Sequence, residues 1–402
     1  MSPWPTSTVG DVTLTVTKGT TPTTIGARFI DEGVSFVKVE SLSTDGNINH
    51  AKVAFINDAT NQLLKRSILA ADDILFSIAG TIGRVAQVRE SDLPANTNQA
   101  VAVVRPDPAV IDSRFLFYCL RDGARVDRAR SRVVQSVQAN LSLAELSSVE
   151  VPLPAIAVQR EIAATLGALD DKIESNRRIA QLVVSWVDAR AGVLISSVPT
   201  HSVQLSEVVE FNRLSIRPGA DTDPLLYLDI ASVSPGKIDE FRSINWADAP
   251  SRARRGVSDG DVIYSTVRPG RRSFALLLEP SPDTVASTGF AVMSPMPSLG
   301  SSLLTSVVGS AEFASYLESV AQGSAYPAVS VEAMSRYTLQ VPDDQADLAR
   351  FEAETMPMRR RAQLAENENR RLSLLRDTLL PELLSGRLSV ARALGQFEAA
   401  VE

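Results

Sequence analysis

The chain has 402 residues, of which 44% are hydrophobic and 22% charged, and its formal net charge is −7. This balance is typical of a soluble globular protein of two or three domains and excludes an intrinsically disordered chain. No uninterrupted apolar run reaches the roughly 18 residues of a membrane span. The single cysteine, Cys119, excludes an intramolecular disulfide and favours a reducing compartment, so we expect a cytoplasmic protein with no membrane partner.

Residues 1–154 are predicted to form a strand-rich mixed domain. Short β-branched or alternating runs, separated by Gly, Asn, Asp and Pro, predict its strands. These runs lie near residues 12–16, 34–39, 74–78, 84–88 and 100–104. An amphipathic helix is expected to follow them, from Ser113 to about Arg132.

Residues 155–198 are predicted to form one long helix. Apolar side chains recur there at spacings of three and four, which is the seam of a helix with coiled-coil character. The seam consists of Ile162, Leu166, Leu169, Ile173, Ala180, Val183, Val187 and Leu194.

Residues 199–345 are predicted to repeat the first domain, with strands near 225–230, 262–266, 274–278 and 291–294 and a helix near 311–321. Residues 346–390 are predicted to form a second long helix, and 391–402 a C-terminal tail. The second seam consists of Phe351, Met358, Ala362, Ala365, Leu372, Leu379 and Leu383. Pro357 and Pro381 are expected to kink or end this helix locally.

The two long helices are expected to pair antiparallel. Asn176 and Asn369 interrupt the two seams at comparable places, and a buried Asn at such a position fixes helix register at a cost in stability. The alternative is that the segments form two unrelated surface helices.

The two domains look like copies, about 190 residues apart. Phe36-Val-Lys-Val-Glu-Ser-Leu corresponds to Leu226-Tyr-Leu-Asp-Ile-Ala-Ser-Val, and Ala71-Asp-Asp-Ile-Leu-Phe-Ser to Asp259-Gly-Asp-Val-Ile-Tyr-Ser. A period this long indicates a duplicated domain, because solenoid repeats span about 20–50 residues. The predicted fold class is therefore α+β: two similar mixed α/β domains joined by two long antiparallel coiled-coil helices, with an internal pseudo-twofold repeat.

Few residues in the chain are suited to catalysis or metal binding. His50 and His201 are the only histidines, and with one cysteine they argue against zinc, haem and Cys–His or Ser–His chemistry. No Gly-x-x-x-x-Gly-Lys-Ser/Thr loop and no Gly-x-Gly-x-x-Gly fingerprint is present. The sequence therefore predicts a binding protein with no catalytic residue, no metal and no cofactor of its own.

Two basic segments suggest a nucleic-acid partner despite the acidic total, because only the surface that meets phosphates has to be basic. In the first domain, Arg121, Arg125, Arg128 and Arg132 have the spacing of a single helix stripe. The alternative is an ordinary solvated helix face. In the second domain the basic side chains fall on loops, at Arg254, Arg255, Arg268, Arg271 and Arg272.

Polar side chains at strand ends are candidates for reading bases. Asn and Gln can read adenine and Arg can read guanine in the major groove. The candidates are Ser77, Thr81, Arg84, Asn98 and Gln99 in the first domain, and Ser265 with the loop arginines in the second. The alternative for Asn98 and Gln99 is that they only satisfy the backbone of a turn.

An ordered set of motifs resembles the specificity subunit of type I restriction–modification systems. It includes Gly19-Thr-Thr-Pro22, Asp73-Ile-Leu-Phe-Ser-Ile-Ala-Gly-Thr-Ile-Gly83 and Leu374-Leu-Arg-Asp-Thr-Leu-Leu-Pro-Glu-Leu-Leu-Ser-Gly-Arg-Leu388. The most specific element is the stretch from Val151 through Gln159-Arg-Glu to Glu174. In the second copy Gln159-Arg-Glu is replaced by Gln345-Ala-Asp, which is a departure from the pattern.

The resemblance implies two target-recognition domains, each reading one half of a bipartite site in double-stranded DNA. It implies that the two helices dock two copies of an adenine methyltransferase subunit, which would bind S-adenosylmethionine, and that motor-nuclease subunits can join. The helix residues expected at those contacts are Gln159, Ile162, Leu166, Leu169, Ile173, Leu372, Leu375 and Leu379. The alternative function is a protein–protein adaptor in a phage-defence assembly that reads no sequence.

Overall fold

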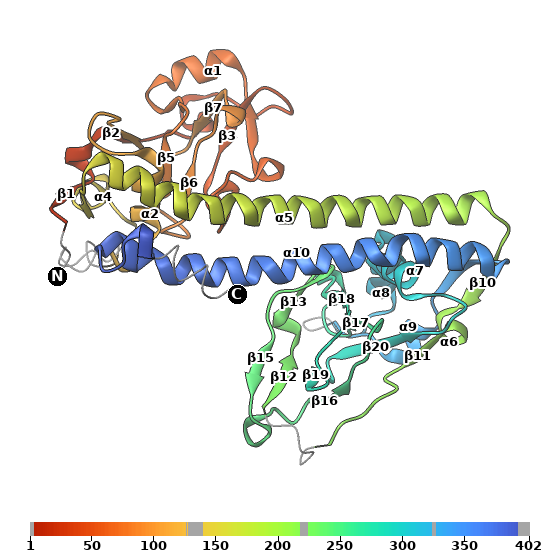
Figure 1. The fold of residues 1–402 in the computed structure, drawn as a ribbon. Coiled ribbons are helices and arrows are strands. Elements are labelled where there is room, and N and C mark those ends of the chain that lie inside the picture. The colour runs from red at the N-terminus through yellow and green to blue at the C-terminus, as the bar shows by residue number, and fades with distance from the viewer. Residues whose placement is uncertain (1–3, 126, 128–139, 218–223, 324–326, 393–402) are drawn as a thin grey trace. The chain divides into compact units, whose positions relative to one another are not determined.

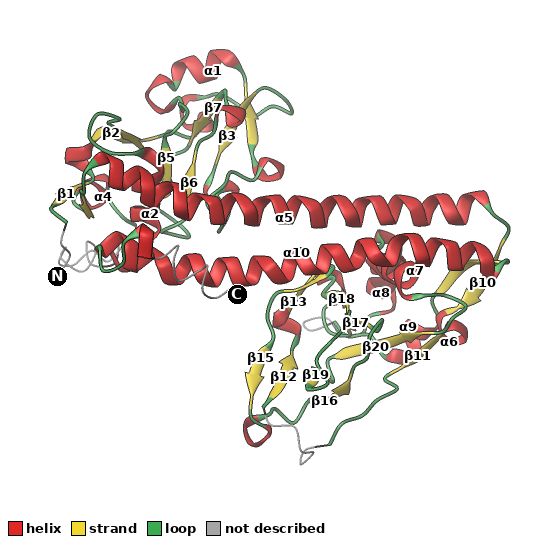
Figure 2. Ribbon diagram, viewed as in Figure 1, coloured by secondary structure: helices red, strands yellow, loops and turns green. Residues whose placement is uncertain are grey.

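The computed structural model describes residues 4–125, 127, 140–217, 224–323 and 327–392. The chain divides into two compact units: unit 1 comprises residues 1–174 and 370–402, and unit 2 comprises residues 175–369. Both units mix strands and helices, and two long helices, α5 and α10, run from one unit into the other (Figures 1 and 2). The predicted fold class is confirmed.

Unit 1 is built on an antiparallel four-stranded sheet of order β2-β8-β5-β6. A second sheet, β4-β3-β7, pairs β3 with β7 in parallel, and β1 pairs with β9. The elements are β1 (Thr6–Thr8), β2 (Thr13–Lys18), β3 (Val34–Val37), β4 (Ala54–Ile56), α1 (Asp58–Leu63), β5 (Ile74–Ser77), β6 (Val85–Gln87), β7 (Ala95–Thr97), β8 (Val101–Pro106), α2 (Ser113–Arg121), α4 (Leu143–Ser147) and β9 (Glu150–Pro152).

Unit 2 repeats this topology. Its sheets have the orders β11-β20-β17-β18 and β15-β12-β19-β16, with β12 and β19 parallel, and β10 pairs with β21. The elements are β10 (Thr200–Gln204), α6 (Leu205–Val208), β11 (Val209–Phe211), β12 (Leu225–Leu228), β13 (Val233–Ser234), β14 (Lys237–Ile238), β15 (Arg242–Ile244), β16 (Ala253–Gly256), β17 (Val262–Ser265), β18 (Phe274–Leu276), β19 (Thr284–Ser287), β20 (Phe290–Pro295), α7 (Ser301–Gly309), α8 (Ala311–Val320), α9 (Val331–Ser335) and β21 (Thr338–Pro342). The first sheets match strand for strand, and the second sheet of unit 2 has the order of β4-β3-β7 with β16 added at its edge, so the sequence repeat is a repeat of structure.

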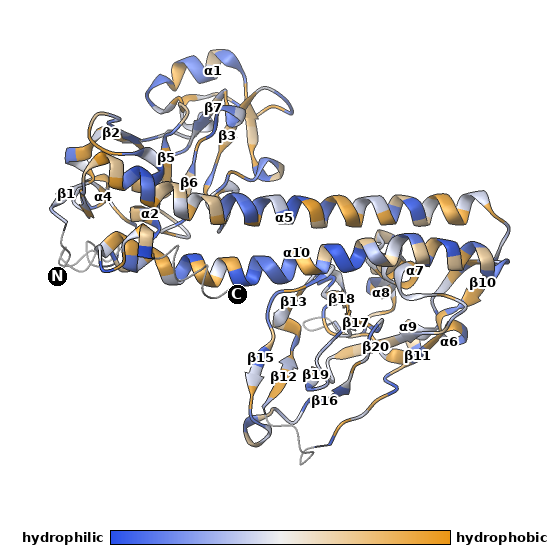
Figure 3. Cartoon of the chain, viewed as in Figure 1, coloured by the Kyte–Doolittle hydropathy of each residue, from blue (hydrophilic) through white to orange (hydrophobic). Residues whose placement is uncertain are grey.

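Helix α5 spans Ile156–Ser197 and helix α10 spans Gln345–Ser385. Apolar and polar residues alternate along both helices (Figure 3). Residues later in α5 pair with residues earlier in α10, which is the order of antiparallel helices. The two helices contact each other within each unit. These pairs are Asp170 with Arg376 in unit 1, and Asn176 with Glu368 and Arg190 with Glu354 in unit 2.

Two expectations about α10 and the domain boundaries need correction. The helix continues through Pro357 and Pro381. Both prolines are exposed, and buried residues in the neighbouring turns pack into the hydrophobic cores. The helices are also not separate from the domains, since each helix has one part in unit 1 and the other in unit 2. Ile162 and Leu383 are buried in the core of unit 1, and Val187 in that of unit 2.

By length and composition, α5 contains an 18-residue stretch apolar enough to cross a membrane, and 22% of that stretch is buried. Its buried residues, which include Val183 and Val187, belong to the core of unit 2. Its charged residues are held within the same unit, because Asp188 accepts a hydrogen bond from Ser306 and Arg190 binds Glu354. We therefore interpret α5 as a packed helix of the fold.

Candidate nucleic-acid interface

Three loops meet at one end of the four-stranded sheet of unit 1. They are the loop after β2, the β5–β6 hairpin loop and the turn before β8. The Gly19 N–H donates to the Asn98 carbonyl at 3.0 Å and the Ile78 N–H to the Ala100 carbonyl at 2.8 Å. Gly19 is required for this approach, because a Cβ there would lie 1.8 Å from the carbonyl oxygen of Thr97. We call this surface the loop edge.

The hairpin loop of the unit 1 loop edge is held by its own side chains. The buried Ser77 hydroxyl donates to the Thr81 carbonyl at 2.6 Å and accepts from the Arg84 N–H at 2.8 Å. The Arg84 guanidinium donates to the Leu42 carbonyl at 3.0 Å. Gly80 and Gly83 have positive φ angles, which favour glycine. Ser77 and Arg84 therefore shape the loop, and Thr81 is exposed on it.

The turn before β8 combines a structural and an accessible side chain. The Asn98 side-chain oxygen accepts from the Ala100 N–H at 3.0 Å, as the turn alternative expected. Gln99 is exposed, and its side-chain oxygen accepts a hydrogen bond from the Thr21 hydroxyl. Gln99 thus ties the loop after β2 to this turn while its amide group stays at the surface.

Unit 2 has the same loop edge with different side chains. The Thr266 N–H donates to the Gly289 carbonyl at 2.9 Å, and the buried Ser265 hydroxyl donates to the Val267 carbonyl at 2.8 Å. Ser265 therefore shapes its loop as Ser77 does. Arg268 and Arg272 adopt left-handed φ angles of 50° and 54°, which cost an L residue about 1–2 kcal/mol each.

The arginines of the unit 2 loop edge differ in their exposure to solvent. Arg271 is exposed, whereas Arg272 is half-buried and donates to the Gly309 carbonyl. Arg254 and Arg255 lie on β16 and are also half-buried, and Arg254 donates to the Ala253 carbonyl at 2.6 Å. Arg271 is thus the most accessible of the predicted basic residues here.

The comparisons with known proteins can be set against this geometry. Residues 1–183 match the family described as the type I restriction modification DNA specificity domain. This part of the chain is therefore similar to that family. The resemblance inferred from the sequence motifs is confirmed. Within the described residues, no group of three or more His, Cys, Asp or Glu side chains is placed to hold a metal ion.

Individual relatives support the same assignment. The chain is 31% identical to the EcoBI specificity subunit of Escherichia coli over 133 residues, which are 33% of this chain and 28% of that protein. It is 25% identical to the putative MjaX specificity subunit of Methanocaldococcus jannaschii over 155 residues, covering 37% of this chain and 36% of that one. The matches thus span about a third of the relatives' length.

The fold resemblance extends further than the sequence matches. The S subunit of a type I restriction–modification system from M. genitalium superimposes with a TM-score of 0.60. The match covers 95% of this chain and 96% of that chain at 15% sequence identity. It shows that the chain shares the fold of that subunit along nearly its whole length, including unit 2, which lies mostly outside the matched specificity domain.

The predicted arginine stripe is interrupted after Arg121, and Arg121 and Arg125 both form ion pairs within the chain, so their role in DNA binding stays a prediction. Helix α2 ends at Arg121, so the stripe has no continuous helix to follow. The Arg121 side chain is 13% exposed, contacts the Phe117 ring and binds Asp170 at 3.2 Å. Arg125 is 14% exposed and binds Asp122 at 2.9 Å. Arg128 and Arg132 lie outside the described residues.

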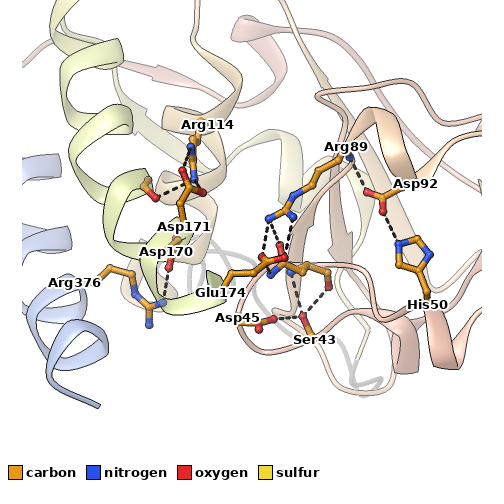
Figure 4. A network of polar contacts seen from close by, with 12 residues as sticks. Ser43, Asp45, His50, Arg89, Asp92, Arg114, Asp170, Asp171, Glu174 and Arg376 are labelled. Carbon is orange, nitrogen blue, oxygen red and sulfur yellow. Dashed lines mark hydrogen bonds and ion pairs between the residues drawn. The ribbon is translucent and has the colours of Figure 1, made fainter. Parts of the chain in front are cut away.

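Asp170 was not identified from the sequence as the ion-pair partner of Arg121. The Asp170 carboxylate of α5 accepts a hydrogen bond from the Tyr118 hydroxyl at 2.6 Å. It also accepts one from Arg376 of α10 at 2.7 Å (Figure 4). Burial and the nearby Asp170 raise the pKa of Tyr118. Burial lowers the pKa of Arg121, and Asp170 opposes that shift. A pair of aspartates on a predicted helix gave no sign that one of them is buried.

The helix residues expected to bind a partner mostly face the chain's own core. Those buried in unit 1 are Gln159, Ile162, Leu166, Ile173 and Leu379, while Leu169, Leu372 and Leu375 are half-buried. The seam spacing that suggested them is the spacing that packs a helix within its own fold.

Gln159 has a structural role in the specificity domain. Its side-chain oxygen accepts from the Asp112 N–H at 2.9 Å, at the start of α2. In unit 2, the Glu352 carboxylate accepts from the N–H groups of Ser302 and Leu303 at the start of α7, at 3.0 and 2.9 Å. Glu352, and not Gln345, is therefore the counterpart of Gln159. The motif is displaced by about one helical turn, because Gln159 is the fourth residue of α5 and Glu352 the eighth of α10.

Proposed function

We propose that the chain is the non-catalytic DNA sequence-recognition subunit of a type I restriction–modification complex. The observation that carries this proposal is the loop edge. It occurs within a DNA specificity domain in residues 1–183, and unit 2 repeats it on a sheet of the same strand order. Two copies of one reading surface in one chain fit a bipartite target.

The differences between the two loop edges support an asymmetric target. Unit 1 exposes Thr81 and Gln99, whereas unit 2 exposes Arg271 at the corresponding hairpin. An amide suits adenine and a guanidinium suits guanine or phosphate. The net charge of −7 is compatible with this role, because phosphates meet only the local surface.

The partners follow from the same proposal. The exposed faces of α5 and α10 carry apolar side chains suited to docking two methyltransferase subunits. On α5 these are Leu182, Trp186 and Val193, and on α10 they are Leu364 and Leu374. The methyltransferase subunits would bind S-adenosylmethionine, motor-nuclease subunits would complete the complex, and the assembly would act in the cytoplasm.

Methylome mapping tests the proposal. The chain is co-expressed with its methyltransferase subunit, and methylated adenines are mapped in the host genome. We expect one asymmetric bipartite motif that disappears when the chain is omitted. Methylation by the purified chain alone with S-adenosylmethionine would refute the non-catalytic role. A complex that enriches no sequence from a duplex library would instead support the adaptor function.

A further inference from the structure

Beyond the apolar seam, unit 1 is fastened to α5 by a polar cluster at the end of β6. Both terminal nitrogens of Arg89 bind the Glu174 carboxylate of α5, at 3.2 and 3.0 Å (Figure 4). Asn47 donates to the same carboxylate at 2.9 Å and accepts from Arg89 at 2.7 Å. A two-point arginine–carboxylate contact fixes direction as well as distance.

The domain side of this contact is itself braced. The Arg89 N–H donates to the Asp92 carboxylate at 2.7 Å, and Asp92 is buried and lies 2.9 Å from His50 (Figure 4). The backbone that carries Arg89 is therefore held by the domain, while Glu174 is held by α5. We call the Arg89–Asn47–Glu174 cluster the unit 1 strut.

Unit 2 also has a strut, with the charges exchanged. On the domain it follows β18, the strand that matches β6, but on the helix Arg360 lies eight residues after Glu352, whereas Glu174 lies fifteen residues after Gln159. Arg360 of α10 binds Glu279, which follows β18, at 2.5 Å, and Asp259 at 3.1 Å. Gln363 of α10 donates to the Leu278 carbonyl at 2.9 Å. Unit 1 thus places the acid on the helix and the base on the domain, and unit 2 places them the other way round.

We propose that the two struts hold each recognition domain at a fixed angle on its own helix and thereby make the complex selective for spacer length. This inference rests on the proposed function. One extra base pair between the half-sites rotates one half-site by about 35° and moves it about 3.4 Å. Apolar contacts are non-directional and allow a domain to roll, whereas a two-point ion pair resists rolling. The unit 1 strut adds such a contact to those that Asp170 and Asp171 of α5 make with α2.

The struts contribute to orientation more than to stability. Arg89 and Glu174 are 50% and 44% exposed, and ion pairs this exposed contribute little to folding free energy. Their loss is expected to leave the fold and the base contacts intact while the domain gains freedom to tilt. That separation makes the proposal testable in the assembled complex.

The test compares spacer lengths with the chain in complex with its methyltransferase subunit. A random duplex library first identifies the bipartite motif, and failure to find one would reject the proposed function itself. Duplexes with fixed half-sites and the native spacer, or one base pair more or less, are then methylated. We expect Arg89→Ala to lower the preference for the native spacer about two- to fivefold, with the half-site base preference unchanged. Arg360→Ala is expected to do the same from unit 2.

Matched variants decide the outcome. Arg387→Ala removes an ion pair with Glu382 that is 61% and 39% exposed but does not join a domain to its helix. It should leave the spacer profile unchanged. Arg89→Glu should broaden the profile further, and Arg89→Glu with Glu174→Arg should restore it. The proposal is overturned if Arg89→Ala gives the profile of Arg387→Ala. It is also overturned if Arg89→Ala abolishes methylation at the native spacer, since the cluster would then be needed for assembly.

Discussion

Removing the Asp170 carboxylate is predicted to destabilise unit 1 more than any comparable surface change. The carboxylate accepts hydrogen bonds from Tyr118, Arg121 and Arg376, and the two guanidinium side chains are 13% and 10% exposed. Deleting one partner of a buried ion pair leaves the other charge uncompensated and costs about 3–5 kcal/mol. Asp170 itself is 16% exposed, so we expect the lower end for Asp170→Ala, about 3 kcal/mol.

The neighbouring residue provides the control. Asp171 is 61% exposed and binds Arg114 at 2.6 Å, so Asp171→Ala should cost at most about 1 kcal/mol. Hydrogen exchange of peptides from α2 measures the local free energy of opening in both variants, independently of unit 2. In a double-mutant cycle, Asp170→Ala with Arg376→Ala should cost less than the sum of the single changes. Equal losses in the Asp170 and Asp171 variants would refute the burial argument.

Four further predictions follow from single side chains. Both polar atoms of Asn369 are buried without a hydrogen-bond partner among the described residues, so Asn369→Leu should raise the urea midpoint of unfolding. Asn96→Leu should lower the free energy of unfolding by about 1–3 kcal/mol, because Asn96 bonds Asn61, Ser67 and the backbone. Burial raises the pKa of Glu352, against opposing N–H bonds, so the folded state holds this proton more tightly than the unfolded state. The stabilising contribution of Glu352 to the free energy of unfolding is full below the ordinary pKa of a glutamate and is lost as pH rises through the raised pKa. Glu352→Gln should therefore remove this pH dependence when free energies of unfolding are measured across pH. Arg271→Ala should weaken DNA binding by the complex and reduce its salt dependence by about one unit, and an unchanged salt slope would show that Arg271 meets no phosphate.

The parts of the fold that are set by local pattern were predictable. The buried runs at β5 and β17 and the apolar seam of α5 follow from alternation and helical spacing alone. The ion pair of Arg121 could not be predicted, for a non-local reason. Arg121 finds its partner Asp170 on another helix, 49 residues away in sequence, and no spacing rule reports that contact. The accessible residues of the loop edges, such as Gln99, were named from the sequence together with Ser77. Only the hydrogen bonds of the structure show that Ser77 shapes its loop, whereas Gln99 is accessible.

The exchanged charges of the two struts make the recognition domains non-interchangeable on their helices, although their sheets share one topology. If the module of unit 2 were grafted onto α5 in place of that of unit 1, Glu279 would lose its partner Arg360, and the strut residue of α5, Glu174, is itself acidic. Grafting the module of unit 1 onto α10 would likewise separate Arg89 from Glu174. A chimaera of either kind should therefore show broadened spacer selectivity. In this chain the shared topology supplies two similar reading surfaces, and the opposite strut polarity determines which surface belongs on which helix.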